Sequence, residues 1–199
     1  SVREWHKSVG SRFHGDFQGL ENWSDEPDVL AELGEAGIAP TFPAHPVHEG
    51  TAFDAQGDKH IVRGDRPLFY LVERGGDDSL EHHLLKQAIE HGADVRFGDR
   101  METIEGPAIL AGGPRTADII AAGHIFETDQ ADGCYIAFDD RLAPLGYSYL
   151  LIQGGRGTLA SCMFSGFKRQ AEYVARTVDF FSAKTGLVMR SPRPFGGFG

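Results

Sequence analysis

Hydrophobic residues between positions 68 and 97 change period twice, from a strand pattern to a helix pattern and back. Residues 68–73 form an apolar run of strand length, and residues 95–97 form a second, shorter run. Between the runs, apolar side chains recur at helical spacing at Leu80, Leu84, Leu85, Ala88 and Ile89. Asp78 and Glu81 fit a capping box at the start of this helix, and Gly92 would end it. This order of strand, glycine-rich turn, helix and strand predicts a βαβ unit.

Beyond residue 100, the chain consists of short strand-like runs separated by turn residues. The runs are residues 108–111, 124–128, 134–138, 147–152 and 158–164. Asp132-Gly133 and Gly154-Gly155 are typical turn dipeptides. The last four runs, joined by short links, predict an antiparallel sheet. A helix over residues 169–184 would pack one apolar side on this sheet and end at Gly186.

The N-terminal third has weaker patterns. We expect a helix over residues 1–9, and a second helix that begins at Ser24 or Asp25, has Pro27 in its first turn and ends near Gly37. Residues 45–63 predict a hairpin around the turn at 54–58, and residues 194–199 predict a loop. Residues 11–23 predict a loop or short strand over a site, or alternatively a small satellite core. Their aromatic and polar residues are Phe13, His14, Phe17, Gln18 and Trp23.

Charge and composition exclude several classes of function. The net charge of −10 argues against nucleic acid as a partner and gives no polybasic contact with an anionic membrane. No apolar run approaches the roughly 20 residues that span a bilayer. The chain has two cysteines, Cys134 and Cys162, without metal-type spacing, which indicates free thiols in a cytoplasmic protein.

Few side chains form a pattern with clear chemistry. Arg74 ends a strand just before a glycine-rich turn and a helix, where ligands gather in α/β folds; the alternative is a surface ion pair with Asp77 or Asp78. Gly75-Gly76 matches no phosphate-binding motif. The histidine pairs at 45/48 and 82/83 diverge, so we expect no metal site. Residues 139–141 predict a turn with a local ion pair, and no base accompanies Cys162. The catalytic residues therefore stay unassigned.

The stretch from Pro144 to Ile152 contains Tyr147 and Tyr149, two positions apart in a predicted strand. Side chains at this spacing share one face of a sheet, so the two phenols would form a broad, partly polar wall. Such a wall suits a flat or apolar ligand, and it equally suits an ordinary core.

Three stretches together resemble the geranylgeranyl reductase family of FAD-dependent oxidoreductases, within the para-hydroxybenzoate hydroxylase-like fold. The first stretch runs from the hairpin at 45–62 through Arg74 and the helix to Gly92-Ala-Asp-Val95. The second is residues 111–118, at the position of a flavin-contacting Asp-Gly turn. The third, residues 144–152, resembles the PxxYxWxFP substrate motif, with Tyr149 for Trp, Leu151 for Phe and Ile152 for the last Pro.

The resemblance implies roles for named residues. Arg74, Met101, Gly113 and Pro114 would contact the flavin, Met101 through its backbone. Pro144, Tyr147, Tyr149 and Leu151 would line the substrate cavity. The implied fold is mixed α+β and α/β: an incomplete FAD-binding α/β unit at 67–123, and a substrate domain with an antiparallel sheet and a packed helix at 124–199. Residues 45–66 would add a hairpin to that sheet, and residues 1–44 would border the active site.

The resemblance also implies a reaction: a flavin-dependent reductase that reduces a double bond of an isoprenoid or other small apolar substrate, with NAD(P)H as the electron donor. Alternatives are a flavin monooxygenase for an aromatic substrate, and an apolar-ligand-binding domain without catalysis. Peripheral contact with a membrane would fit an isoprenoid substrate. The sequence contains neither the GxGxxG strand nor the later Gly-Asp segment, so we expect an internal piece of a longer protein that binds FAD weakly by itself.

Overall fold

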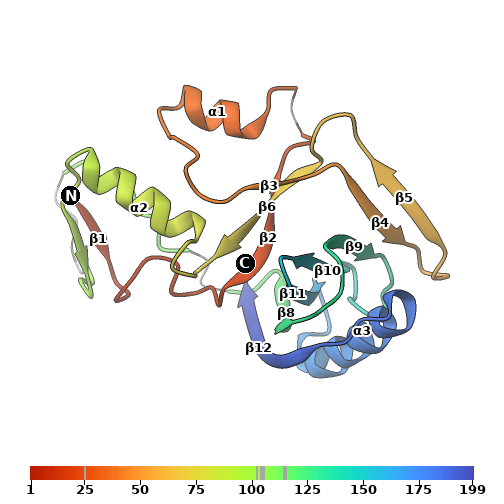
Figure 1. Ribbon diagram of the computed structural model, residues 1–199. Helices are drawn as coiled ribbons and strands as arrows, with labels where there is room; N and C mark the ends of the chain where they lie inside the picture. The colour runs from red at the N-terminus through yellow and green to blue at the C-terminus, as the bar shows by residue number, and fades with distance from the viewer. Residues whose placement is uncertain (25, 102, 104–105, 114–115) are drawn as a thin grey trace.

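The computed structural model describes residues 1–199 except 25, 102, 104–105 and 114–115, and these residues form the expected mixed α+β fold (Figure 1). The largest sheet has the strand order β12-β8-β11-β10-β9-β4-β5. Its strands are β4 (Glu49–Phe53), β5 (Lys59–Arg63), β8 (Ile120–Glu127), β9 (Gly133–Ala137), β10 (Tyr147–Gln153), β11 (Arg156–Met163) and β12 (Arg190–Phe198). Its neighbouring strands are antiparallel except β4 and β9, which are parallel.

Two smaller sheets and three α-helices complete the described part of the fold. An antiparallel sheet has the order β2-β6-β3, and its strands are β2 (Asp16–Glu21), β3 (His45–Val47) and β6 (Phe69–Arg74). A parallel pair joins β1 (Val2–Glu4) to β7 (Val95–Phe97). The helices are α1 (Val29–Glu35), α2 (Leu80–Glu90) and α3 (Gln170–Thr185).

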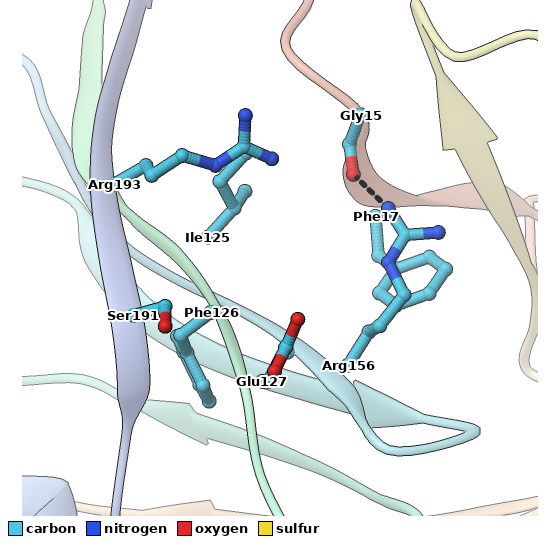
Figure 2. Close-up of a pocket in the computed structure, with 9 residues that line it drawn as sticks. Gly15, Phe17, Ile125, Phe126, Glu127, Arg156, Ser191 and Arg193 are labelled. Carbon is cyan, nitrogen blue, oxygen red and sulfur yellow. Dashed lines mark hydrogen bonds between the residues drawn. The ribbon is translucent and has the colours of Figure 1, made fainter.

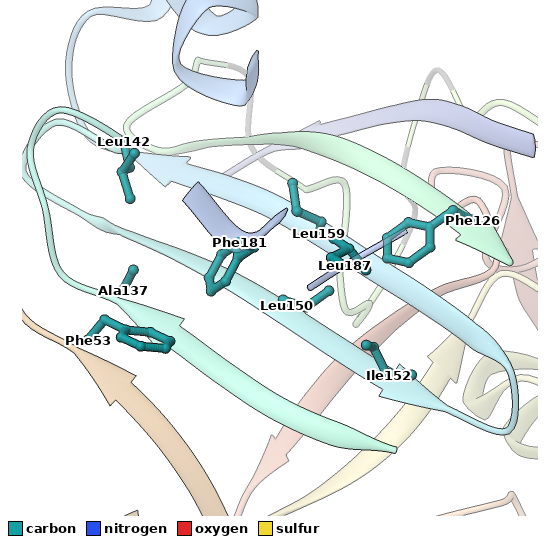
Figure 3. Close-up of a cluster of buried hydrophobic side chains, with 9 residues drawn as sticks. All are labelled: Phe53, Phe126, Ala137, Leu142, Leu150, Ile152, Leu159, Phe181 and Leu187. Atoms are coloured by element: carbon teal, nitrogen blue, oxygen red, sulfur yellow. The ribbon is translucent and has the colours of Figure 1, made fainter. Parts of the chain in front are cut away.

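One face of the large sheet packs against α3 (Figure 1). Side chains alternate along β10, so Leu150 and Ile152 point to this face, where Phe181 of α3 is fully buried with them (Figure 3). Ser148 lies on the same face, and its hydroxyl is 3.0 Å from the Thr177 hydroxyl of α3, which satisfies both polar groups inside the core. The predicted packing of the last helix on the sheet is therefore confirmed.

The opposite face of the large sheet packs in part against the three-stranded sheet. Leu151 of β10 is buried with Phe17 of β2 and Leu71 of β6. The backbone N–H of Phe17, on the free edge of β2, donates to the Thr158 hydroxyl of β11 at 2.8 Å. This bond satisfies an edge donor and fixes where β2 crosses the large sheet.

Two predictions about the chain ends are wrong. Residues 1–9 form strand β1 followed by bends. At least half of the surface of Val2 and of Trp5 is exposed, so a helix here would have no buried apolar side. Strand β7, in contrast, supplies a ladder of hydrogen bonds to β1. Residues 194–199 are not a loop but belong largely to β12. This strand lies at the edge of the sheet, where proline and glycine are tolerated.

Both helix starts predicted in the first half are also wrong. Helix α1 begins after Asp28, whose carboxylate accepts from the Leu30 N–H at 3.0 Å; the alternative start Asp25 lies outside the described residues. Helix α2 begins after Ser79, because Glu81 bonds to the Gly75 N–H and to Arg74 instead of closing a capping box. Tertiary partners thus outcompete the local caps.

Three strand predictions need correction. The βαβ unit is absent among the described residues, because β7 pairs with β1 rather than with β6. Residues 108–111 form no strand: Ile109 and Leu110 are exposed and have no ladder partner among the described strands. The run 45–53 divides after Val47, so that β3 joins β6 while β4 and β5 form a hairpin in the large sheet.

Candidate functional site

The face of the large sheet that looks away from α3 contains a shallow floor of small residues. Directly opposed residues share a face, and the register places Tyr149, Ala160, Gly123 and Phe195 in one row across β10, β11, β8 and β12. The next row along the strands is Tyr147, Cys162, Ala121 and Gly197. Small side chains in the middle of both rows leave room between the aromatic rings of β10 and β12.

A cavity of about 490 Å³ occupies this position, within the size range of small-molecule sites. Its lining combines sheet residues with the segment that leads into β2. The sheet and chain-end residues are Ile119, Ala121, Tyr149 and 195–199, and the segment contributes Arg12, Phe13, His14, Asp16 and Gln18. The wall is therefore mostly apolar and aromatic on the sheet side, and polar on the side of the segment.

Arg74 holds in place the segment that leads into β2, residues 12–18, which is called the entrance segment below. Its guanidinium lies 4.0 Å from the centre of the Phe13 ring, and its Nη1 donates to Gln18 Oε1 at 2.9 Å. It also forms an ion pair with Glu81 of α2. Burial raises the pKa of Glu81, but the hydrogen bonds from Arg74 and the Gly75 N–H more than offset this, so the pKa lies below its usual value. Arg74 thus connects α2, β2 and the cavity wall.

The chemistry of the tyrosine wall is that of neutral groups. The rings of Tyr147 and Tyr149 lie side by side, with centres 6.4 Å apart. Burial raises the pKa of Tyr149 well above its usual value, with a further contribution from the nearby Cys162 and Asp16. Burial also raises the pKa of Tyr147, which is hydrogen-bonded to the Cys162 thiol. Both phenols keep their protons at neutral pH and can donate hydrogen bonds.

A second cavity of about 280 Å³ lies on the same side of the large sheet, where β8, β11 and β12 meet the start of β2 (Figure 2). It is lined by Gly15, Phe17, Ile125, Phe126, Glu127, Arg156, Gly157, Ser191 and Arg193. Arg156 donates to Glu73 Oε2 at 2.6 Å and to the Gly15 carbonyl at 2.9 Å. This cavity is polar and charged, in contrast to the larger one.

The residues expected to contact a flavin lie in different environments. Arg74 stands behind Phe13, as described above, rather than paired with Asp77 or Asp78. Gly113 has a positive φ of 71° and lies against the guanidinium of Arg12, a residue of the larger cavity. Met101 is exposed. Pro114 lies outside the described residues.

The structure brings one of the four expected substrate residues, Tyr149, into the lining of the larger cavity. Tyr147 lies beside it and is half-buried. Leu151 packs instead in the core beneath β2. The Pro144 carbonyl accepts from the Phe164 N–H at 3.0 Å, so this proline ties the segment before β10 to the end of β11.

Other candidate groups have structural partners. In the described part of the chain, no three His, Cys, Asp or Glu side chains gather so as to hold a metal ion. Asp139 and Arg141 form the predicted local ion pair at 2.6 Å, which lowers the pKa of Asp139. Burial raises the pKa of Cys162 to about 12, so it stays a thiol. None of the described helices is long and apolar enough to cross a membrane.

Sequence patterns indicated part of this lining. The aromatic and polar composition of residues 11–23 predicted a segment over a site, and Phe13, His14 and Gln18 do line the cavity, whereas Phe17 is core and Trp23 is exposed. Phe195 and the floor of β8 were missed. Their only signal is the small-residue composition of residues 121–123, which has meaning only once the register with β11 and β12 is known.

No protein-family model and no curated protein matches the chain. Solved structures do match it. A geranylgeranyl bacteriochlorophyll reductase-like protein from Thermoplasma acidophilum is 16% identical with a TM-score of 0.67, over 98% of this chain and 59% of that one. A triple mutant of a flavin-dependent brominase is 12% identical with a TM-score of 0.61, over 98% and 60%. CtdE, solved with FAD and a substrate, is 13% identical with a TM-score of 0.55, over 98% and 62%.

These matches confirm the expected resemblance at the level of the fold, which is the fold of FAD-dependent oxidoreductases and monooxygenases. The chain spans about 60% of the length of each of these three structures. Because a fold can carry many reactions, the substrate and the reaction have to be argued from the cavity itself.

Proposed function

We propose that this chain forms the substrate side of an FAD-dependent oxidoreductase that reduces a double bond of an apolar substrate bound in the larger cavity. The observation that carries the proposal is the row Tyr149, Ala160, Gly123 and Phe195. It has one aromatic side chain at each end and two small residues between them. A cavity of this kind binds a chain or a ring by contact area and excludes water from it.

The larger cavity has a wall that fits a flat cofactor ring. Gly197 faces the cavity opposite Ala121, and a Cβ built on it meets no atom within 4 Å, so the missing side chain leaves open space there. Phe13 and Tyr149 add aromatic surface, and Arg12 adds a positive charge at the rim. When bound, the flavin would supply the hydride chemistry.

The side chains of the cavity would position the substrate. Tyr149 and Phe195 would hold an apolar group between them, and Arg74 would keep Phe13 against it by fixing the entrance segment. The Tyr149 phenol stays protonated, so it would act as a hydrogen-bond donor and not as a base. An NAD(P)H-dependent supply of electrons is part of the proposal.

A second candidate, a flavin monooxygenase acting on an aromatic substrate, is favoured by the aromatic character of the same lining. Phe13, Tyr149 and Phe195 line the cavity from the segment before β2, from β10 and from β12, and aromatic rings pack well against an aromatic substrate. The two reactions differ in whether the product gains two hydrogens or one oxygen atom.

One experiment separates the two candidates. The purified protein, supplied with FAD and NADPH, is incubated without oxygen with a polyprenyl alcohol and, in air, with a panel of phenols, and products are analysed by mass spectrometry. We expect the polyprenyl product to gain two hydrogens. Tyr149→Ala should lower kcat/KM about tenfold or more, because truncating a buried aromatic side chain removes roughly 1.5–3 kcal/mol of apolar contact.

The matched control is Tyr135→Ala, which truncates a tyrosine on the α3 face of the neighbouring strand β9. This variant should lose stability but not catalytic efficiency. If oxygenated phenols form and no reduced polyprenyl product does, the monooxygenase candidate replaces the reductase candidate. If the protein converts neither class of substrate in a flavin-dependent reaction, both candidates are wrong.

A further inference from the structure

The smaller cavity has a net positive lining. Arg156 and Arg193 each contribute one positive charge and Glu127 one negative charge, which leaves one positive charge among the residues that surround it. Figure 2 shows the Arg193 side chain extending from β12 over Ile125, and the Arg156 side chain across the cavity from it, beside Gly15 and Phe17. The apolar surface of Phe17 and Ile125 lies beside these charges.

The two arginines are not equally engaged. Arg156 forms an ion pair with Glu73, donates to the Gly15 carbonyl and lies 5.3 Å from the centre of the Phe17 ring. The Arg193 guanidinium has no hydrogen bond or ion pair with any residue that the structure describes. Its planar fork of donors, which suits bidentate recognition of an oxyanion, is therefore available to a ligand.

A bulge in β12 directs Arg193 to this cavity. Arg190 pairs with Glu127 and Arg193 with Ile125, so β12 contains one more residue than β8 over this stretch. Ser191, inside the bulge, has a left-handed φ of 48°. If the same sequence paired with β8 residue for residue from Arg190 onward, the alternation would turn Pro192 and Pro194 to the cavity face, and Arg193 and Phe195 away from it. Strained backbone kept beside a cavity indicates a functional constraint.

The same alternation places a residue of each cavity next to the other along β12. Arg193 lines the smaller cavity and Phe195 the larger one, and they are successive residues on one face of β12. Residues two apart on a strand are separated by roughly 7 Å. A ligand along this strand would therefore meet a positive charge at one end and aromatic surface at the other.

We propose that the substrate is an apolar carboxylic acid, with its carboxylate on Arg193 and Arg156 in the smaller cavity and its apolar body on Tyr149 and Phe195. This inference rests on the proposed function, whose apolar substrate it specifies further. A carboxylate matches Arg193, the one guanidinium of the lining that has no carboxylate partner among the described residues, whereas a phosphate with its higher charge would meet stronger repulsion from Glu127 and from the Glu73 that pairs with Arg156.

The test uses three probes with one isoprenoid chain and different head groups: farnesoic acid, farnesol and farnesyl monophosphate. Each is titrated into the purified protein by calorimetry at neutral pH, below its micellar concentration. We expect farnesoic acid to bind about tenfold or more tighter than farnesol, because a charge-assisted hydrogen bond exceeds a neutral one, and tighter than the monophosphate.

Three variants locate the effect. Arg193→Gln should remove the preference of farnesoic acid over farnesol while leaving farnesol binding unchanged. Arg190→Gln is the matched control: it changes the net charge equally on the same strand, but Arg190 pairs with Asp129 and does not line the cavity, so the preference should persist. Glu127→Gln should shift the preference toward the monophosphate, because it leaves two net positive charges in the lining.

Equal binding of the three probes would overturn the carboxylate subsite and leave the apolar cavity of the proposed function intact. An equal loss in Arg193→Gln and Arg190→Gln, or tighter binding of the monophosphate by the unmodified protein, would also overturn it. If none of the three probes binds, both the subsite and the apolar-substrate proposal fail together.

Discussion

The tyrosine and cysteine side chains on the cavity face of the large sheet are neutral. Burial raises the pKa of both tyrosines on β10 and raises the pKa of Cys134 and of Cys162 to about 12. Desolvation disfavours a phenolate or a thiolate there, because each would lose its hydration without gaining a cation. The face therefore presents neutral hydrogen-bond donors to a ligand and no nucleophile.

Both thiols should accordingly resist modification in the folded protein. At pH 8, a thiol with a pKa of about 12 is ionised to roughly one part in 10⁴, so reaction with Ellman's reagent should be slower than that of an exposed cysteine by about three orders of magnitude. The measurement is release of the coloured thiolate at pH 8, with the protein in guanidinium chloride as the control that titrates both cysteines. Rapid labelling of Cys162 in buffer would show that the Tyr147–Cys162 contact opens readily.

His124 gives the protein a stability that depends on pH. It points to the α3 face of β8, its Nδ1 is buried without a hydrogen-bond partner in the described part of the chain, and burial lowers its pKa. The unfolded chain therefore binds a proton at about pH 6.5 more readily than the folded protein does. The free energy of unfolding should fall as the pH drops below about 6.5 and onward through the lower folded-state pKa.

The check is urea unfolding between pH 8 and pH 5 for the unmodified protein, His124→Gln and His45→Gln. The slope against pH should flatten in His124→Gln, because this site no longer titrates. His45 is exposed on β3, so its replacement should leave the slope unchanged. An unchanged slope in His124→Gln would mean that groups other than His124 cause the loss of stability at low pH.

At the scale of elements, two of the described non-glycine residues have a left-handed backbone: Ser191 in the β12 bulge with a φ of 48°, and Leu145 before β10 with a φ of 58°. An L-residue in this region costs roughly 1–3 kcal/mol, which glycine avoids. Ser191→Gly and Leu145→Gly should therefore raise Tm by roughly 2–4 °C each, since about 1 kcal/mol corresponds to this shift in a chain of this size.

Ser165→Gly serves as the matched control, because Ser165 has no positive φ and its replacement only adds freedom to the unfolded chain. Its Tm should fall slightly. If Ser191→Gly lowers Tm as Ser165→Gly does, the bulge is not strained. Deleting Ser191 altogether removes the extra residue, puts Pro192 opposite Phe126 and leaves Arg193 opposite Ile125, so the preference for farnesoic acid and the circular dichroism spectrum should both persist.

The elements that the sequence predicted well are those with a strong local signal. Helix α3, with its closing Gly186, and the strands β6 and β8 to β11 follow from periodicity and turn residues. The segment before β2 and Tyr149 were likewise indicated as site residues. The features that could not be predicted depend on strands that are distant in the sequence. Strand β1 forms only because it pairs with β7, and Arg193 and Phe195 point to the cavity face only because β12 has one bulge opposite β8. A slip of one residue there would reverse both side chains.

The whole molecule presents surfaces for a ring and an apolar chain better than for a diphosphate. The turn between β6 and α2 is the part that most resembles a phosphate site, yet its Gly75 N–H already donates to Glu81 Oε2, and Asp77 and Asp78 add negative charge next to it. An anion at this helix start would have to displace a buried carboxylate. The larger cavity, in contrast, offers Gly197 and four Phe or Tyr side chains to a planar group.

The 199-residue chain by itself should therefore bind FAD and riboflavin with similar affinity, micromolar or weaker, because the diphosphate and adenine of FAD gain little from it. Fluorescence quenching of the two flavins at neutral pH measures both dissociation constants, and Tyr149→Ala should weaken both equally. Sub-micromolar binding of FAD with much weaker binding of riboflavin would contradict this prediction, since it would require a diphosphate site in a sequence that contains no GxGxxG segment. Similar weak binding of both would place the flavin ring, and not its phosphates, against the cavity that the substrate shares.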